Sequence, residues 1–440
     1  MKIINGEGFF DFWKGLPKNQ EDEETEKIVK DIIKAVRIEG DMAVRRFASL
    51  YDRSSPENLE VPVTKIKEAV LDLENSNPEL VKALRFSAEN IRCFSLAQGE
   101  QLKDFEIEVV PGVFCSQRVI PVEKAAVYVP GGRFPLISSA LMCLIPAFCA
   151  GVKEICFSSP PGEDGLPAKI ILAAAGIAAE VCGQWKADFQ KSNFRLFAIG
   201  GAQAIAAFAL GTESIPRCDV VAGPGNKYVA AAKRILFGET GIDFIAGPSD
   251  ILVIIDDNSS IELAAADMLA QAEHDPDARA RALVSNQVMA KGLLDCLQSS
   301  KAYLNTITRR SLDAGGLIIV YNNMEEALKI AKFIAPEHLE LMVSNPADWI
   351  PSLKNYGSLF IGSLSAEVLG DYSSGLNHIL PTSGSSRFTS GFSLRHFLKT
   401  PTTLRCENGS GYTAALEAAE IIARCEGLNS HAESVSIRCK

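Results

Sequence analysis

Histidine is scarce in this chain. Only five histidines occur among 440 residues, and all lie in the last two-fifths: His274, His338, His378, His396 and His431. Four of them stand in short polar clusters, QAEH, APEH, GLNH and GLNSH. Each one taken singly fits an ordinary surface or core histidine, and His396 does so best. Because four such clusters follow one another, we interpret them as parts of a single site.

An excess of positive charge is also missing, as are the signs of secretion. The net charge of −10 argues against a polyanionic partner such as nucleic acid. The eleven cysteines contain no C-x-x-C spacing, which predicts reduced thiols in a cytosolic protein rather than a disulfide framework. The opening segment, MKIINGEGFFDFWKGL, lacks the apolar core of a secretory signal.

Only one uncharged stretch comes close to the length of a membrane span, FPLISSALMCLIPAFCAGV at residues 134–152. Pro135 and Pro146 interrupt it, and Ser138 and Ser139 are polar. We therefore predict a buried helix here and no association with a membrane.

The chain as a whole predicts an α/β protein in four regions. Residues 1–115 are mainly helical by their apolar spacing. Residues 116–245 and 246–380 each alternate short Val- and Ile-rich runs with Ala-rich helical stretches, which is typical of βαβ units around a largely parallel sheet. Residues 381–440 contain one helix, Tyr412–Cys425, and then a polar tail. We expect two incomplete Rossmann-like units with a helical N-terminal region and a small C-terminal tail.

A candidate metal site lies in the run LAQAEHDP, residues 269–276. Gln271 and His274 stand three apart in a segment of helical periodicity, and residues so spaced share one face of a helix. An amide oxygen and an imidazole would then point the same way. Asp267 and Glu273 add acid nearby. A Q-x-x-H pair alone is a weak signal, and the scarcity of histidine elsewhere strengthens it.

Three glycine-bearing loops suggest a nucleotide site: residues 130–132, 200–203 and 223–226. Glycine at a strand-to-helix turn lets backbone N–H groups approach a phosphate. None of the loops completes G-x-G-x-x-G, since Tyr228 stands where the third glycine would be. From spacing alone, a dinucleotide site and three ordinary turns both remain open.

Eight segments, read in chain order, resemble the motif series of the histidinol dehydrogenase family: VYVPGG, GGAQAIAA, VAGPGNKYVAAAKR, GIDFIAGPSD, LAQAEHDP, IAPEHLEL, GDYSSGLNHILPT and EGLNSHAESV. The resemblance runs from about residue 25 to the C-terminus. It implies oxidation of L-histidinol through the aldehyde to L-histidine, the last steps of histidine biosynthesis, with two NAD and one bound zinc. It also implies an intertwined cytoplasmic homodimer.

The same resemblance implies roles for individual residues. The implied zinc ligands are Gln271, His274, Asp371 and His431. The implied acid–base pair is Glu337 and His338. Substrate is implied to be held by Ser249, His378 and Glu426 together with the four ligands and His338. NAD is implied to contact Tyr128, Gln203 and Asn226. Glu426 and His431 are implied to join the partner subunit's site.

The residue types agree with this chemistry. Imidazole and carboxylate suit zinc, and a neutral amide oxygen is an acceptable additional ligand. Alcohol oxidation needs a base of near-neutral pKa, which His338 can supply. A carboxylate such as Glu337 can activate the water that adds to the aldehyde. Pro336 indicates the first turn of a helix at this point, where Glu337 would otherwise be a plain first-turn acid.

Departures from the family pattern are few. Residues 133–137 differ in the expected NAD loop, and the connection at 182–193 is longer than usual. Leu376 stands where proline is common, and His396 stands where an acid is common. Two alternatives remain: a paralogous zinc- and NAD-dependent alcohol dehydrogenase acting on another small amino or hydroxy alcohol, and a non-catalytic metal- or nucleotide-binding protein.

Overall fold

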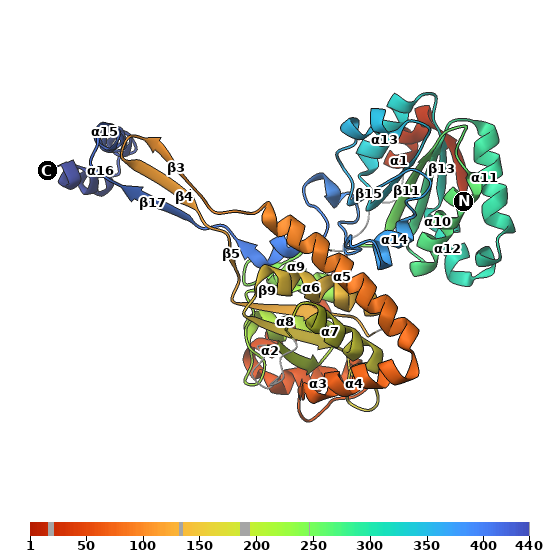
Figure 1. Cartoon of the computed structure of the whole chain (residues 1–440), viewed down its shortest axis with the longest axis horizontal. Coiled ribbons are helices and arrows are strands. Elements are labelled where there is room, and N and C mark those ends of the chain that lie inside the picture. Colours follow the sequence, from red (N-terminus) through yellow and green to blue (C-terminus); the bar gives the residue numbers. More distant parts are fainter. Residues whose placement is uncertain (16–21, 132–134, 185–193, 246, 440) are drawn as a thin grey trace.

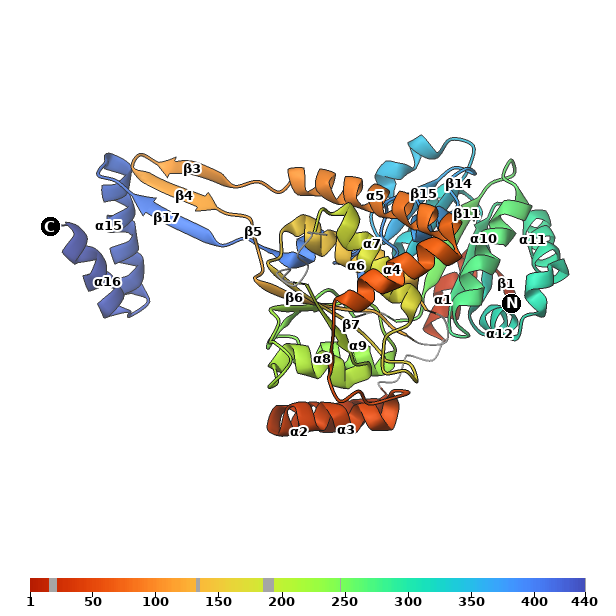
Figure 2. The same cartoon turned by 60° about the horizontal axis from the view of Figure 1, so that its bottom comes forward.

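The structure, a computed structural model, describes residues 1–15, 22–131, 135–184, 194–245 and 247–439. Two six-stranded sheets, each with helices on both faces, form two α/β units that lie side by side (Figure 1). A thin C-terminal arm projects from one of these units (Figure 2). The predicted α/β class with two parallel-sheet units is therefore confirmed.

The first α/β unit is built on a sheet of spatial order β10-β9-β6-β7-β8-β2, parallel except for β2. Its strands are β2 (Glu60–Val61), β6 (Lys124–Tyr128), β7 (Glu154–Ser159), β8 (Phe194–Ala198), β9 (Val220–Ala222) and β10 (Gly241–Ile242). One face packs on α2 (Glu23–Glu39), α3 (Asp41–Tyr51), α8 (Gly201–Leu210) and α9 (Lys227–Leu236). The other packs on α4 (Thr64–Ser76), α5 (Pro78–Glu100), α6 (Ile137–Ala150) and α7 (Lys169–Val181).

The second α/β unit has a fully parallel sheet of order β1-β13-β12-β11-β14-β15. Its strands are β1 (Lys2–Asn5), β11 (Asp250–Ile255), β12 (Arg279–Val284), β13 (Leu317–Val320), β14 (His338–Met342) and β15 (Ser358–Ile361). One face packs on α10 (Ile261–His274), α11 (Gln287–Ser299) and α12 (Thr306–Gly315). The other packs on α1 (Phe9–Lys14) and α13 (Met324–Ile334), and the short α14 (Glu367–Tyr372) follows β15.

Local sequence explains these elements. Every residue of β11, DILVII, is buried, as expected for a central parallel strand covered by helices on both faces. Helix α10 begins where the Ser260 hydroxyl accepts a hydrogen bond from the backbone N–H of Leu263. The uncharged stretch at 134–152 contains the almost wholly buried helix α6, as predicted. No helix in the described part of the chain is long and apolar enough to cross a bilayer.

The C-terminal arm combines two distant parts of the chain. Strands β3 (Phe105–Val110) and β4 (Val113–Gln117) pair with each other, and β17 (Thr402–Cys406) pairs with β4. Next to these strands in the chain, β5 (Ile120–Pro121) pairs with β16 (Leu398–Lys399). Helices α15 (Ser410–Cys425) and α16 (Asn429–Ser436) lie at its far end (Figure 1). The helix predicted at 412–425 corresponds to α15, whereas the prediction that only a polar tail follows it is wrong, because α16 forms there.

Candidate active site

The start of β14 carries the two residues predicted to act as acid and base. Glu337 directly precedes the strand and His338 is its first residue, and they are 4% and 3% exposed. The helix expected at Pro336 is wrong. Helix α13 ends at Ile334, and Ala335 caps it in the left-handed region with a φ of 51°. Proline is common just after such a cap, so Pro336 marks the end of one helix rather than the start of another.

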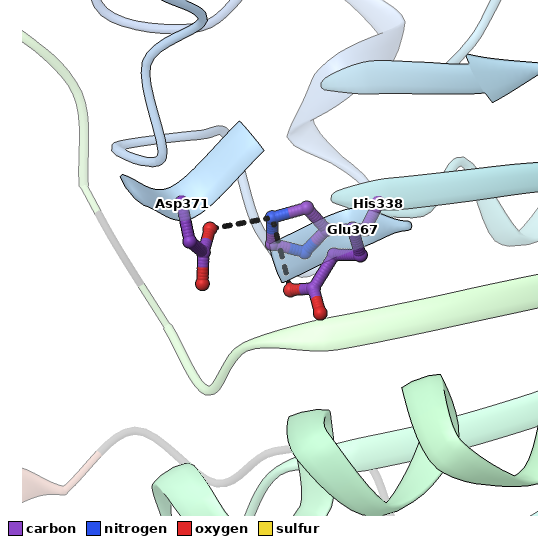
Figure 3. A group of neighbouring side chains, drawn as sticks. All are labelled: His338, Glu367 and Asp371. Atoms are coloured by element: carbon purple, nitrogen blue, oxygen red, sulfur yellow. Dashed lines mark ion pairs between the residues drawn. The ribbon is translucent and has the colours of Figure 1, made fainter. Parts of the chain in front are cut away.

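The ring of His338 lies among carboxyl groups. Its Nε2 is 3.6 Å from Oε1 of Glu367 and 3.8 Å from Oδ1 of Asp371, both on α14 (Figure 3). Its Nδ1 is 3.3 Å from the backbone oxygen of Asp250. Burial lowers the pKa of His338 to about 3, although the Asp250 oxygen opposes this shift. The ring is therefore neutral near neutral pH, and these contacts are not ion pairs.

His338 is consequently suited to accept a proton. A neutral imidazole keeps one nitrogen lone pair free for this purpose. With Nδ1 facing a carbonyl oxygen, that nitrogen is best assigned the proton, which leaves the lone pair on Nε2. Nε2 has no hydrogen-bond partner among the described residues, so it is available to a substrate hydroxyl.

Two hydrogen bonds join Glu337 to the neighbouring strand β11. The register that pairs Ile251 with His338 places Asp250 opposite Glu337. The backbone N–H of Asp250 donates to Oε2 of Glu337 at 2.9 Å, and the backbone N–H of Glu337 donates to Oδ1 of Asp250 at 2.7 Å. Burial, and then the charge of Asp250, raises the pKa of Glu337 well above its usual range. Such a carboxyl group is a stronger base once it is ionised, and it can then take a proton from a reacting water.

A cluster of buried carboxyl groups surrounds this pair. Burial raises the pKa of Glu340 and of Glu367 to about 9, and that of Asp371 to about 6. Asp267 on α10 also has a raised pKa because it is buried. Several carboxyl groups this close cannot all ionise unless a cation compensates them. The cluster is therefore suited to receive positive charge.

Three of the four residues predicted as zinc ligands lie around this cluster. Gln271 and His274 stand on α10, which packs against the helix α14 that carries Asp371. Gln271 is 0% exposed, yet its Oε1 and Nε2 have no hydrogen-bond partner among the described residues. His274 is exposed at the end of α10, and it is close enough to lower the pKa of Asp371.

This donor set fits a metal ion. An unsatisfied buried amide is costly, and coordination of a cation by its oxygen removes the cost. Ligand atoms of His338, Glu367 and Asp371 also all lie within 4.8 Å of one another. Sequence reasoning missed Glu367, although it precedes Asp371 by four residues and so shares one face of α14.

The remaining predicted ligand is elsewhere in the chain. His431 lies on α16, Glu426 is the C-cap that follows α15, and both are exposed. These helices stand at the tip of the arm, which points away from the second unit (Figure 1). One chain alone therefore does not bring His431 or Glu426 to the cluster.

The predicted substrate residues Ser249 and His378 lie beside the cluster. Ser249 precedes Asp250 at the start of β11. Nδ1 of His378 is 3.1 Å from the backbone oxygen of Asp371, and its Nε2 is 3.1 Å from the hydroxyl of Ser139. Burial lowers the pKa of His378. Because Ser139 belongs to α6, this contact places the site where the two units meet.

The three residues predicted to bind NAD line one cavity in the first unit. The cavity measures about 640 Å³ and contains Tyr128, Gln203 and Asn226 in its wall. Tyr128 is the last residue of β6, and Gln203 and Asn226 follow β8 and β9, so all three lie at the carboxyl ends of strands, where ligands of open parallel sheets bind. The close approach of Gly223, at a φ of +118°, to the Tyr128 carbonyl leaves no room for a Cβ. Of the two departing segments, residues 133–134 and 185–193 lie outside the described residues.

Asp52 is a feature of this cavity that the sequence did not reveal. Its Oδ2 accepts hydrogen bonds from the backbone N–H of Gly200 at 3.1 Å and from Nε2 of Gln203 at 3.3 Å. Burial raises its pKa to about 6. The backbone N–H of Gly201 donates to the hydroxyl of Tyr128 at 3.2 Å. These contacts fix the wall of the cavity at the start of α8.

Comparisons with known proteins agree with one another. A sequence model described as histidinol dehydrogenase matches residues 16–439. Histidinol dehydrogenase of Aquifex aeolicus (strain VF5) is 41% identical over 421 residues, which cover 95% of this chain and 93% of the relative. That of Thermus thermophilus is 40% identical and covers 95% of each chain. The crystal structure of histidinol dehydrogenase from Elizabethkingia anophelis superposes with a TM-score of 0.88 at 31% identity, covering 100% of this chain and 97% of the other.

Proposed function

Because the chain belongs to the histidinol dehydrogenase family and is therefore an NAD-dependent oxidoreductase of histidine biosynthesis, we propose that it oxidises L-histidinol through L-histidinal to L-histidine with two NAD and one bound zinc. The observation that carries this proposal is the buried, neutral ring of His338, whose Nε2 faces the carboxyl groups of Glu367 and Asp371. It supplies a proton acceptor beside a site suited to a cation.

Zinc would be held by Gln271, His274 and Asp371, with His431 of the partner subunit as the fourth ligand. When bound, the metal supplies a fixed anchor for the imidazole and amino groups of histidinol rather than polarising the alcohol. The support is the buried amide of Gln271 without a partner among the described residues, together with raised pKa values in the neighbouring carboxyl groups. Ligand atoms of nitrogen and oxygen type suit zinc.

NAD would be held in the cavity lined by Tyr128, Gln203 and Asn226, and when bound it would supply a hydride acceptor. A cavity of about 640 Å³ lies in the size range of small-molecule and cofactor sites. Asp52 holds the Gln203 amide in place by accepting a hydrogen bond from its Nε2. The contact between His378 and Ser139 joins the second unit to α6, which belongs to the same unit as this cavity.

The first oxidation needs a base for the hydroxyl proton as the hydride leaves. His338 takes this proton at Nε2, because its Nδ1 faces the Asp250 carbonyl. The product of this step is the aldehyde. Ser249 and His378, with Glu426 of the partner subunit, hold the substrate while His338 acts.

The second oxidation needs water added to the aldehyde. Glu337 activates this water, and among the described residues only its Oε2 has a hydrogen bond, so Oε1 is the oxygen that faces the water. The hydrate then loses its second hydride and a proton to give the carboxylic acid. His338 thus accepts the hydroxyl proton, and Glu337 activates the water.

The proposed assembly is a homodimer in which the arm of each subunit completes its partner's site. The support is the exposed position of Glu426 and His431 at the tip of the arm, away from the other ligands (Figure 2). The test mixes inactive His338→Asn subunits with inactive His431→Ala subunits under conditions that exchange chains. A heterodimer then contains one doubly defective site and one intact site, so activity returns. Heterodimers seen by mass spectrometry without activity would show that the arm serves its own subunit.

The choice of substrate is tested by NADH formation with L-histidinol against a panel of small amino and hydroxy alcohols. We expect L-histidinol to be preferred by a wide margin in kcat/KM. Preference for another alcohol would instead indicate a paralogous dehydrogenase, and zinc binding without NADH formation would indicate a non-catalytic protein. The proposed compartment is the cytoplasm, with support from the ten cysteines between Cys93 and Cys425, which are free.

A further inference from the structure

Asp250 contacts both residues of the proposed acid–base pair. Its backbone N–H and its Oδ1 form two reciprocal hydrogen bonds with Glu337, at 2.9 and 2.7 Å. Its backbone oxygen lies 3.3 Å from Nδ1 of His338. Asp250 itself is only 3% exposed. One aspartate at the start of β11 therefore sets the position of both groups.

A buried arginine holds the Asp250 side chain. Nη1 of Arg281 donates to Oδ2 of Asp250 at 3.2 Å, and the two side chains are 6% and 5% exposed. The guanidinium lies over the ring of Trp13, 5.0 Å from its centroid. Arg281 and Asp250 stand on the paired strands β12 and β11. Both oxygens of Asp250 are thus engaged, one by Arg281 and one by the backbone of Glu337.

Stability alone gives little reason for such a pair. Two charges buried in a sheet core lose their hydration, and an apolar pair of similar volume is often at least as stable. Burial accordingly lowers the pKa of Arg281 to about 10, and this group still carries its charge at neutral pH. A fixed orientation is what the ion pair provides and an apolar pair would not.

We propose that Arg281 and Asp250 form a positioning pair that holds the carboxyl group of Glu337 in the orientation required to activate water in the second oxidation. This inference rests on the proposed function. Arg281 fixes the Asp250 carboxylate, Asp250 fixes the backbone and the Oε2 of Glu337, and Oε1 is thereby aimed at the reacting centre. Loss of Arg281 leaves Asp250 buried without its cation and free to turn away from Glu337.

The consequence is selective for the step that uses Glu337. Displacement of a catalytic group by about 1 Å can cost on the order of 100-fold in rate. We therefore expect Arg281→Met to lower kcat for histidinal oxidation by about 10- to 100-fold, with KM for histidinal changed by less than about threefold. Oxidation of histidinol to histidinal should fall by less than about fivefold, because His338 touches only the backbone of Asp250.

Conservative and compensating variants separate orientation from folding. Arg281→Lys keeps a cation beside Asp250 and should recover most of the lost rate. The double variant Arg281→Met with Asp250→Asn removes both charges but keeps an acceptor for the Glu337 backbone N–H. Its kcat for histidinal oxidation should therefore be higher than that of Arg281→Met alone. Zinc content and melting temperature are measured for each variant, and the double variant keeps the test available if Arg281→Met folds poorly.

The matched control is Arg195→Met in the first unit. Arg195 likewise pairs with an acid, Glu60 at 2.6 Å, and lies 5.1 Å from the centroid of the Phe197 ring. Its loss should leave the ratio of the two oxidation rates unchanged. The inference is overturned if Arg281→Met reduces both oxidations equally, or if the double variant is no better than Arg281→Met. A wild-type enzyme that does not oxidise histidinal overturns the proposed function and this inference with it.

Discussion

Replacement of Gln271 by methionine should stabilise the metal-free protein but not the zinc-loaded protein. Gln271 is fully buried, and both polar atoms of its amide have no partner among the described residues. A buried polar group without a partner costs about 1–3 kcal/mol. Methionine has a similar length and no such group. In the chelator-treated protein we therefore expect Gln271→Met to raise the free energy of unfolding by about 1–2 kcal/mol.

In the zinc-loaded protein this gain should be cancelled. Loss of one ligand is expected to weaken zinc binding at least about tenfold, which removes about 1.4 kcal/mol of the stability that the metal confers. A change of 1 kcal/mol shifts the melting temperature of a unit of 150–250 residues by about 2–4 °C. Gln271→Met should thus melt a few degrees above wild type after chelation and within about 2 °C of wild type at saturating zinc. Scanning calorimetry with and without chelator measures both.

Gln203→Met provides the matched control. Gln203 is also buried on a helix, but its Nε2 donates to Asp52 at 3.3 Å. Its removal should therefore destabilise the protein by about 1 kcal/mol with or without zinc. If chelated Gln271→Met instead melted below chelated wild type by as much as Gln203→Met does, the argument from the unsatisfied amide would be refuted.

Three further predictions concern the acid–base groups and the cofactor cavity. His338→Asn should lower kcat by about 10²–10⁴-fold and leave zinc content unchanged, and loss of zinc by elemental analysis would contradict a base role without ligation. Glu337→Gln should slow histidinal oxidation at least about tenfold more than histidinol oxidation in separate rate assays, and equal losses would contradict water activation by this group. Burial raises the pKa of Asp52 from 3.8 to about 6. The contribution of Asp52 to the stability of the folded protein is therefore fully present below a pH equal to the lower pKa, and it is lost as the pH rises through the higher pKa. The stability of Asp52→Asn relative to wild type should therefore rise between about pH 4 and about pH 7, by at most about 3 kcal/mol in the free energy of unfolding. Melting temperatures of both proteins measure this rise, and a difference that does not change with pH would contradict the pKa shift.

Local patterns were sufficient to predict much of the fold. The apolar spacing that predicted a helix around Gln271 corresponds to α10, Ile261–His274. The uncharged stretch at 134–152 contains α6, Ile137–Ala150. Both cases depend on helical periodicity or on continuous burial, which a single segment displays by itself.

Features that depend on distant partners were not predictable. Asp52 meets Gly200 across 148 positions of the chain, and nothing near Asp52 in the sequence indicates this contact. Helix α16 forms although its sequence is polar, because Ala432 is fully buried where α16 packs on α15. The helix start expected at Pro336 is wrong because proline is compatible with either a helix start or the position just after a helix end.

The candidate site shows the same division. Gln271 and His274 could be paired from their spacing alone, and Glu367 could have been paired with Asp371 by the same rule. That α10 packs against α14, and that Glu367 and Asp371 reach the ring of His338, are properties of tertiary packing that the sequence does not display. Assignment of substrate and cofactors came from the family resemblance and not from these local patterns.

The most direct test of the proposed four-electron oxidation is the stoichiometry of a complete turnover. Purified zinc-loaded enzyme is given limiting L-histidinol and excess NAD, and NADH and amino-acid products are measured together. We expect two NADH for each L-histidinol consumed, with L-histidine as the product and no accumulation of histidinal. One NADH per L-histidinol with histidinal released, or no NADH from L-histidinol at all, would contradict the account.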